Sequence, residues 1–157
     1  MIAYDHSDLG EQVARYLSSL GIVRDFDARQ DDAGLPAIFE PHMMDTEAEA
    51  VAVRVVDIEQ DYHDSNPVVT LNVTIRSEPW DIEGLQDLSG LVWAALHRRE
   101  EVFELTAGRS VLYSERAQIG ATVPDGENRR YARTDTYIMR VQVPRMNSLE
   151  EGQKSHG

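Results

Sequence analysis

The sequence of 157 residues contains no cysteine. Disulfide bonds, thiolate catalysis, cysteine-ligated zinc and iron–sulfur clusters are therefore excluded together. Long apolar runs are also missing: no stretch of about 18 apolar residues occurs, so we expect no membrane-spanning segment. The first residues include no basic side chain ahead of an apolar stretch, so the sequence predicts no signal peptide.

The motifs of the common enzyme chemistries are missing as well. We find neither of the glycine-rich phosphate-binding patterns and no G-x-S-x-G nucleophile elbow. No two of the five histidines have the one-turn helical spacing of paired metal ligands. The acidic stretch 57–64 resembles a calcium loop, but it has Tyr62 where the turn needs glycine, and it lacks the closing glutamate. We therefore predict that the protein is not an enzyme and has no cofactor or metal site.

The charge of the chain is one-sided, with a formal net charge of −13 at pH 7. Such a chain repels the phosphates of naked duplex DNA, which argues against DNA binding by phosphate neutralisation. Residues 25–66 carry twelve acids against two arginines, whereas residues 109–145 carry seven arginines against four acids. One interpretation is a solvated acidic face. The other is a polarised subunit whose acidic part meets the basic part of a neighbour, a contact that builds rings or filaments.

The stretch from Val68 to His97 predicts the core of the fold. From Val68 to Arg76, apolar and mostly polar residues alternate, which indicates a half-buried strand. Pro79 and Asp81 follow, and both residue types are favoured at the start of a helix. Because the next apolar residues recur at helical spacing, we expect a helix that folds back over the apolar face of the strand. Its expected apolar stripe comprises Ile82, Leu85, Leu88, Ser89, Val92, Trp93 and Leu96.

Four further segments complete the expected fold. A helix is predicted over Ser7–Gly21, with Asp8 and Glu11 forming a capping box. The alternating patterns predict strands at Ala50–Ile58, Arg109–Ile119 and Tyr131–Val143. The order α-β-β-α-β-β indicates an α+β domain with an antiparallel or mixed sheet and both helices packed on one face. We place this single domain at residues 1–145 and expect residues 146–157 to form a polar, disordered tail.

Three places on this fold are candidate protein interfaces. Two are the long connections Glu59–Pro67 and Gly120–Arg130, because long loops are often functional. The third is the part of the second helix away from its apolar stripe, where a leucine is flanked by small residues. The alternative for this place is that the segment around Phe103 covers it. The candidate interface residues are Asp61, His63, Asp64, Leu91, Ala95, Asp125, Glu127, Arg129 and Arg130.

Four segments, in this order, carry a resemblance to a known family. They are the opening helix DLGEQVARYLSSLGI, the segment IFEPHMMD before AVAVRVV, the strand and helix VVTLNVTIRSEPWDIEGLQDLSGLVWAALH, and the final strand YARTDTYIMRVQV. In the order and texture of these elements, the sequence resembles the tail terminator, or minor capsid, proteins that join head and tail in long-tailed bacteriophages. The charged residues after Ile58 depart from the shorter, glycine-containing turn expected from the family.

The resemblance implies a structural role in a virus particle. Proteins of this family form a ring, commonly of six subunits, on the head-proximal end of the tail tube. The ring ends tube growth and joins the tail to the head, so the implied partners are further copies of the chain, the tail tube protein and the head completion or neck protein. DNA passes through the lumen without specific binding, and no cofactor, catalysis or membrane is involved. The implied location is the virion, after assembly in the cytoplasm of the bacterial host.

Two alternatives remain at the level of the sequence. The first is another head–tail connector, such as a stopper or adaptor protein, whose partner would be the portal side of the junction. The second is a small acidic enzyme or ligand-binding domain, which would need a concave pocket with convergent polar groups.

Overall fold

A computed structural model gives the fold of the chain and describes residues 6–27, 34–44, 49–62, 65–105, 108–125 and 129–143. Three of the candidate interface residues, His63, Asp64 and Glu127, lie outside the described residues, as does the expected tail at 146–157. The domain limits 1–145 therefore stay a prediction.

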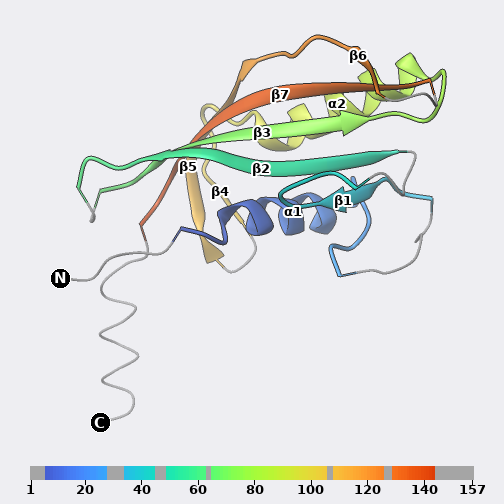
Figure 1. Ribbon diagram of the computed structural model, residues 1–157. Helices are drawn as coiled ribbons and strands as arrows, with labels where there is room; N and C mark the ends of the chain where they lie inside the picture. Colours follow the sequence, from blue (N-terminus) through green and yellow to red (C-terminus); the bar gives the residue numbers. More distant parts are fainter. Residues whose placement is uncertain are drawn as a thin grey trace.

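The centre of the molecule is an antiparallel set of long strands (Figure 1). They are β2 (Ala50–Glu59), β3 (Val68–Arg76), β5 (Ser110–Gln118) and β7 (Arg130–Val141). In β3 the alternation expected from the sequence is confirmed, since every second side chain is fully buried and those between them are partly exposed. The buried ones are Val69, Leu71, Val73 and Ile75. One face of the sheet is therefore apolar and covered, and the other is polar.

Three short strands extend the sheet. They are β1 (Ala37–Phe39), β4 (Phe103–Glu104) and β6 (Val123–Asp125). The strand order is β1-β2-β3-β7-β5-β4, and β6 pairs with β7 outside this path. Because β1 runs parallel to β2 while the other pairs are antiparallel, the sheet is mixed. The expected order α-β-β-α-β-β omitted these strands because two or three residues are too few to show a period of two.

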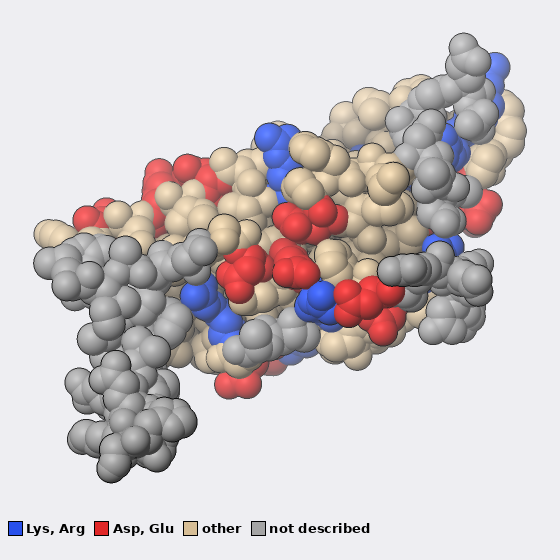
Figure 2. All heavy atoms as spheres, turned by 60° about the horizontal axis from the view of Figure 1, so that its bottom comes forward, with Lys and Arg blue, Asp and Glu red and all other residues tan. Residues whose placement is uncertain are grey.

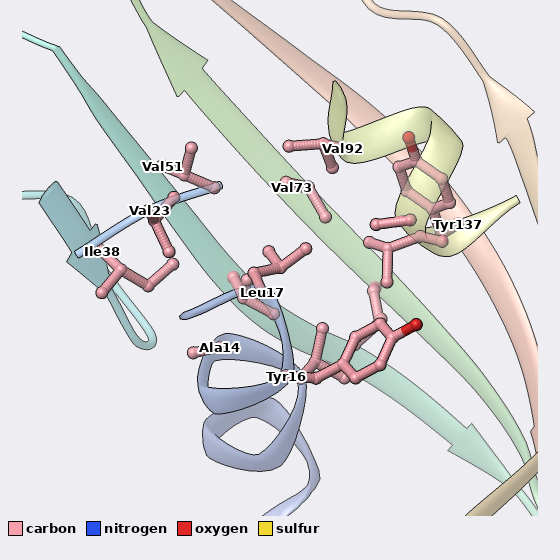
Figure 3. Close-up of a cluster of buried hydrophobic side chains, with 14 of the residues drawn as sticks. Ala14, Tyr16, Leu17, Val23, Ile38, Val51, Val73, Val92 and Tyr137 are labelled. Carbon is pink, nitrogen blue, oxygen red and sulfur yellow. The ribbon is translucent and has the colours of Figure 1, made fainter. Parts of the chain in front are cut away.

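Both helices pack against the apolar face of the sheet. The helices are α1 (Leu9–Ser19) and α2 (Ile82–Leu96). Figure 3 shows Leu17 of α1 and Val92 of α2 pointing toward the same layer of strand side chains, which includes Val51 and Val73. These residues belong to one buried cluster. Each buried side chain of this kind stabilises the fold by roughly 1.5–3 kcal/mol, so this layer holds the two helices on the strands.

The caps at the helix ends agree only in part with those predicted from the sequence. The Asp81 carboxylate accepts a hydrogen bond from the Gly84 amide at 2.8 Å, as an N-cap does. The expected capping box at Asp8 is wrong, because its side chain makes no capping bond and instead accepts from the Gln12 side chain at 2.7 Å. Gly21 has a φ of 74° just after α1, as expected at the end of a helix.

The apolar stripe of α2 is narrower than the sequence indicates. Ile82 and Trp93 were placed in it, but they are 42% and 40% exposed, respectively. Both lie at the edge of the stripe, where a helical period alone cannot decide whether a neighbour covers the side chain. Trp93 is stacked on His97 and lies below the Arg116 guanidinium, which is 5.7 Å from the ring centre. This aromatic side chain thus packs against a histidine and an arginine at the surface.

Candidate functional site

The connection between β2 and β3 ends in an exposed acidic turn. We call Asp57, Ile58, Glu59, Asp61 and Tyr62 the hairpin tip; all five are exposed. Tyr62 is 72% exposed. The turn is fixed by Ser65, whose amide and hydroxyl both donate to the Tyr62 carbonyl, at 2.9 and 2.7 Å. The register shift between Val55 and Asp57 leaves Val56 as an extra, exposed residue before the tip.

The opposite end of the sheet presents a tryptophan and an arginine. Trp80 is 69% exposed, and the Arg129 guanidinium lies 5.2 Å above its ring. The Trp80 amide donates to the Arg129 carbonyl at 2.9 Å. Both residues have positive φ angles, 64° and 59°, which is uncommon for residues other than glycine and costs roughly 1–3 kcal/mol each. The surrounding fold therefore holds the indole in an exposed position.

The candidate interface residues predicted from the sequence lie far apart in the structure and do not form one site. Asp61 lies at the hairpin tip, whereas Asp125 and Arg129 lie at the other end, because β3 pairs Val68 with Arg140 and Arg76 with Ala132. A strand of nine residues spans ~30 Å, so the two connections cannot form one site within a single copy. The exposure of Tyr62 and Trp80 was not predictable from the sequence, since an aromatic residue in a connection is as compatible with burial as with exposure.

Three further candidate interface residues, Leu91, Ala95 and Arg130, differ in how far they are exposed to solvent. Leu91 is 53% exposed, and Phe103, which could have covered it, contacts the Tyr16 ring at 5.1 Å between ring centres. Ala95 and Arg130 are buried. Their side chains are covered in this fold: Ala95 belongs to the core cluster, and Arg130, the first residue of β7, is 5% exposed. Leu91 therefore is the one residue on α2 that the interface prediction leaves open to a partner.

A buried carboxylate anchors the connection between β5 and β6. Asp135 is fully buried and accepts from Arg133 at 2.8 Å, with the Arg116 guanidinium 3.7 Å away. Its other oxygen accepts from the Gly120 amide at 3.0 Å. A Cβ on Gly120 would lie 2.0 Å from the Thr134 carbonyl oxygen, so only glycine allows this approach. Such a fully paired buried charge is structural, because removing one partner would leave the others uncompensated.

A tyrosine lies beside this cluster in the core. Tyr137 is fully buried, and burial raises the pKa of its hydroxyl to about 12, although the Arg116 cation acts in the opposite direction. The phenol therefore stays protonated at neutral pH. A phenol that is sealed from solvent and neutral cannot meet a substrate, so Tyr137 is part of the packing.

A groove lies at the C-terminal end of α2. Its volume is ≈ 740 Å³, and it is lined by Ala94, residues 97–101 and Tyr113; we call it the α2 groove. Arg98 pairs with Glu101 at 2.7 Å, and Arg99 lies 3.4 Å from Glu115. The pKa of Arg99 is raised, first by its side-chain interaction with Tyr113 and then by the charge of Glu115. The groove lining thus holds two arginines and two glutamates, so its formal charges balance.

The face that carries α1 and β1 has acidic clusters among fewer basic side chains (Figure 2). Arg15 of α1 pairs with Asp27 at 2.8 Å and with Glu11 at 3.1 Å. The hydrogen bond from Arg15 lowers the pKa of Asp27. Burial raises the pKa of Glu40, and the charge of Glu11 adds to that effect. These groups form an ordinary solvated surface, in which exposed ion pairs contribute little.

A metal-binding cluster and a membrane-spanning helix are both absent from the part of the chain that the structure describes. No group of three or more histidine, aspartate or glutamate residues there could hold a metal ion. No helix there is long and apolar enough to cross a membrane.

Comparison with known proteins gives a likeness in fold. No protein-family model matches the sequence. No curated protein matches it either. Seven chains of solved structures resemble it. One belongs to a structure described as the virion of a native gene transfer agent (GTA) particle; the match has a TM-score of 0.56 and 12% sequence identity and covers 88% of this chain and 100% of that chain. At this identity the likeness concerns the fold alone.

Proposed function

We propose that this protein is a structural, non-catalytic subunit of a phage-like particle. The observation that carries the proposal is the fold shared with a chain of a gene transfer agent virion, since the likeness extends over the whole of that chain. The described surface is consistent with this role: it presents exposed apolar and aromatic groups at both ends of the sheet, including Tyr62 and Trp80. Exposed aromatic side chains of this kind are typical anchors of protein interfaces.

The specific role that we propose is that of a tail terminator. In this role, copies of the chain form a ring, commonly a hexamer, on the head-proximal end of the tail tube and contact the tube protein on one side and the neck on the other. The resemblance of the sequence to tail terminator proteins supports this assignment. The net charge of −13 is compatible with DNA passing through the ring, because like charge lowers the adhesion of a polyanion. The protein would then reside in the virion after assembly in the bacterial cytoplasm.

The test is the binding of the purified protein to tail tubes and to portal complexes from a matching particle. We expect gold-labelled protein at one end of the tubes in electron micrographs and no binding to isolated portals. Binding to portals without binding to tubes would instead indicate a stopper or adaptor. Binding to neither would contradict a role at the head–tail junction.

A further inference from the structure

The outer edge of β2 is covered by another strand along only part of its length. β1 lies beside one end of β2 and pairs with Ala50, Val51 and Ala52 (Figure 1). Within the described part of the chain, no strand pairs with residues 54–59 on this side, and their backbone makes no hydrogen bond outside the ladder with β3. We call the open side of residues 54–59 the β2 edge. Because alternate residues of a strand turn their amide and carbonyl groups to each side, the β2 edge presents main-chain donors and acceptors that another strand could bind.

The side chains on the two faces of the β2 edge differ in chemistry. Residues that lie opposite each other in neighbouring strands share a face of the sheet. Ile58 pairs with the buried Val69 and so lies on the apolar face, yet it is 36% exposed. Asp57 pairs with Thr70 and lies on the polar face, as does Glu59 two residues later. A strand added here would therefore have alternate side chains beside an apolar group and beside carboxylates.

The charge of the β2 edge selects what can bind it. Asp57 and Glu59 are exposed and have no cationic partner among the described residues. Arg54 is the one cation of residues 54–59, so their formal charge is negative. The carboxylates would repel the same edge of a second copy, since like charges on neighbouring strands are unfavourable. They would attract a strand with basic side chains, so one set of charges excludes a wrong partner and favours a right one.

A second copy of the chain does not offer such a strand in its described part. Its arginine-rich strand is β7, which carries Arg130, Arg133 and Arg140. β7 lies inside the sheet, paired with β3 on one side and with β5 and β6 on the other. Because both of its edges are occupied, β7 cannot add to the β2 edge of a neighbour. The chemistry of the edge therefore points to a different protein.

We propose that the β2 edge binds an extended segment of a different protein by strand addition, and that this segment alternates apolar and basic side chains. Its main chain bonds to residues 54–59, its apolar side chains cover Ile58, and its basic side chains meet Asp57 and Glu59. In strand addition, main-chain hydrogen bonds give affinity and alternate side chains give specificity. The inference goes beyond the proposed function, because it names the chemistry of a partner segment whether or not that partner belongs to a tail.

The test measures amide hydrogen exchange of the whole chain with a synthetic peptide in which valine and lysine alternate. With the peptide at about ten times its dissociation constant, the outward-facing amides of residues 54–59 should exchange about tenfold more slowly. One control peptide has the same composition but its valines and lysines in two blocks, which removes the alternation. Another is N-methylated at every amide, which removes its main-chain donors. Neither control should slow exchange at the β2 edge.

A charge exchange in the protein tests the same contact. The double variant Asp57→Lys with Glu59→Lys should bind the valine–lysine peptide about tenfold more weakly and should gain affinity for a valine–glutamate peptide. The matched control is Glu83→Lys with Asp87→Lys on the exposed side of α2, which changes the net charge equally and should leave peptide binding unchanged. Thermal melting checks that both variants fold as the wild type does.

The outcomes separate strand addition from general attraction by charge. Slower exchange that is confined to residues 54–59 and requires the alternating, unmethylated peptide would support the inference. Equal effects of the block peptide, protection elsewhere in the sheet, or unchanged exchange at millimolar peptide would overturn it. These measurements involve no tail tube and no portal, so their failure would leave the proposed function standing, and a failure of tube binding would leave this inference standing.

Discussion

At Gly120, the close packing of the connection between β5 and β6 leaves no room for a side chain. Its Cβ position is occupied by the Thr134 carbonyl oxygen, at 2.0 Å, and its amide binds the buried Asp135 carboxylate. We expect Gly120→Ala to lower the free energy of unfolding by about 1–3 kcal/mol, because the added methyl group must displace backbone. Urea denaturation measures this change.

A second glycine provides the control for that substitution. Gly90 lies inside α2, and a Cβ there would meet no atom within 4 Å. Gly90→Ala should therefore stabilise the protein by about 0.5–1 kcal/mol through helix propensity. Equal losses in both variants would show that the close approach at Gly120 is not the cause.

Tyr137 should make stability fall at high pH. Its folded-state pKa is raised from 10.0 to about 12, so the folded protein binds this proton more tightly than the unfolded chain does. The contribution is complete below pH 10 and is lost as the pH rises from 10 through 12. Tyr137→Phe cannot ionise and should gain stability relative to the wild type across this window. A difference between the two proteins that is independent of pH from 8 to 12 would contradict the buried, neutral phenol.

At the scale of elements, the two helices begin with the same residue type but not with the same interaction. Asp81 caps α2 through the Gly84 amide, whereas Asp8 makes no capping bond to α1. We expect Asp81→Ala to lower the free energy of unfolding by about 1 kcal/mol. Asp8→Ala should cost less, because it loses only a side-chain bond to Gln12. Thermal or urea unfolding measures the stability of both variants. A larger loss of stability in the Asp8 variant than in the Asp81 variant would contradict this expectation.

The helices and strands also show which elements a sequence pattern can predict and which it cannot. The strand Val68–Arg76 and the helix after it were predictable, because each has enough residues for its period to emerge and one face to bury. The strand β1 was not, since three residues carry no period and their order depends on pairing with β2. A capping box at Asp8 was equally a local pattern, and the neighbouring Gln12 competed for the carboxylate.

The long connections between strands were predictable as segments, but the side chains that protrude from them were not. Loop length and turn residues indicated the connection after β2, and the exposed tip is there. Which residues protrude depends on the fold around them: Trp80 is held outward by a left-handed backbone, and Ala95 is covered by the core. The α2 groove has no sequence signature, because it forms only where the end of α2 meets Tyr113 of β5.

At the scale of the whole molecule, the fold determines which surfaces are free to meet other proteins. A curved mixed sheet covered by two helices on one face leaves its ends and lateral edges to meet other proteins. The fold is shared with a chain of a gene transfer agent virion. Acidic side chains protrude at the hairpin tip, and two arginines and two glutamates line the α2 groove. The proposed role as a structural subunit therefore depends on the contacts that these ends and edges make with neighbours.

We propose that this protein ends the growth of a tail tube, and the length of tubes assembled with and without it tests that claim most directly. Tube protein from a matching particle is polymerised alone and with increasing amounts of this protein, and tube lengths are measured by electron microscopy. We expect shorter tubes of more uniform length, each with a ring of added density at one end. An unchanged length distribution and bare tube ends at saturating protein would contradict the claim.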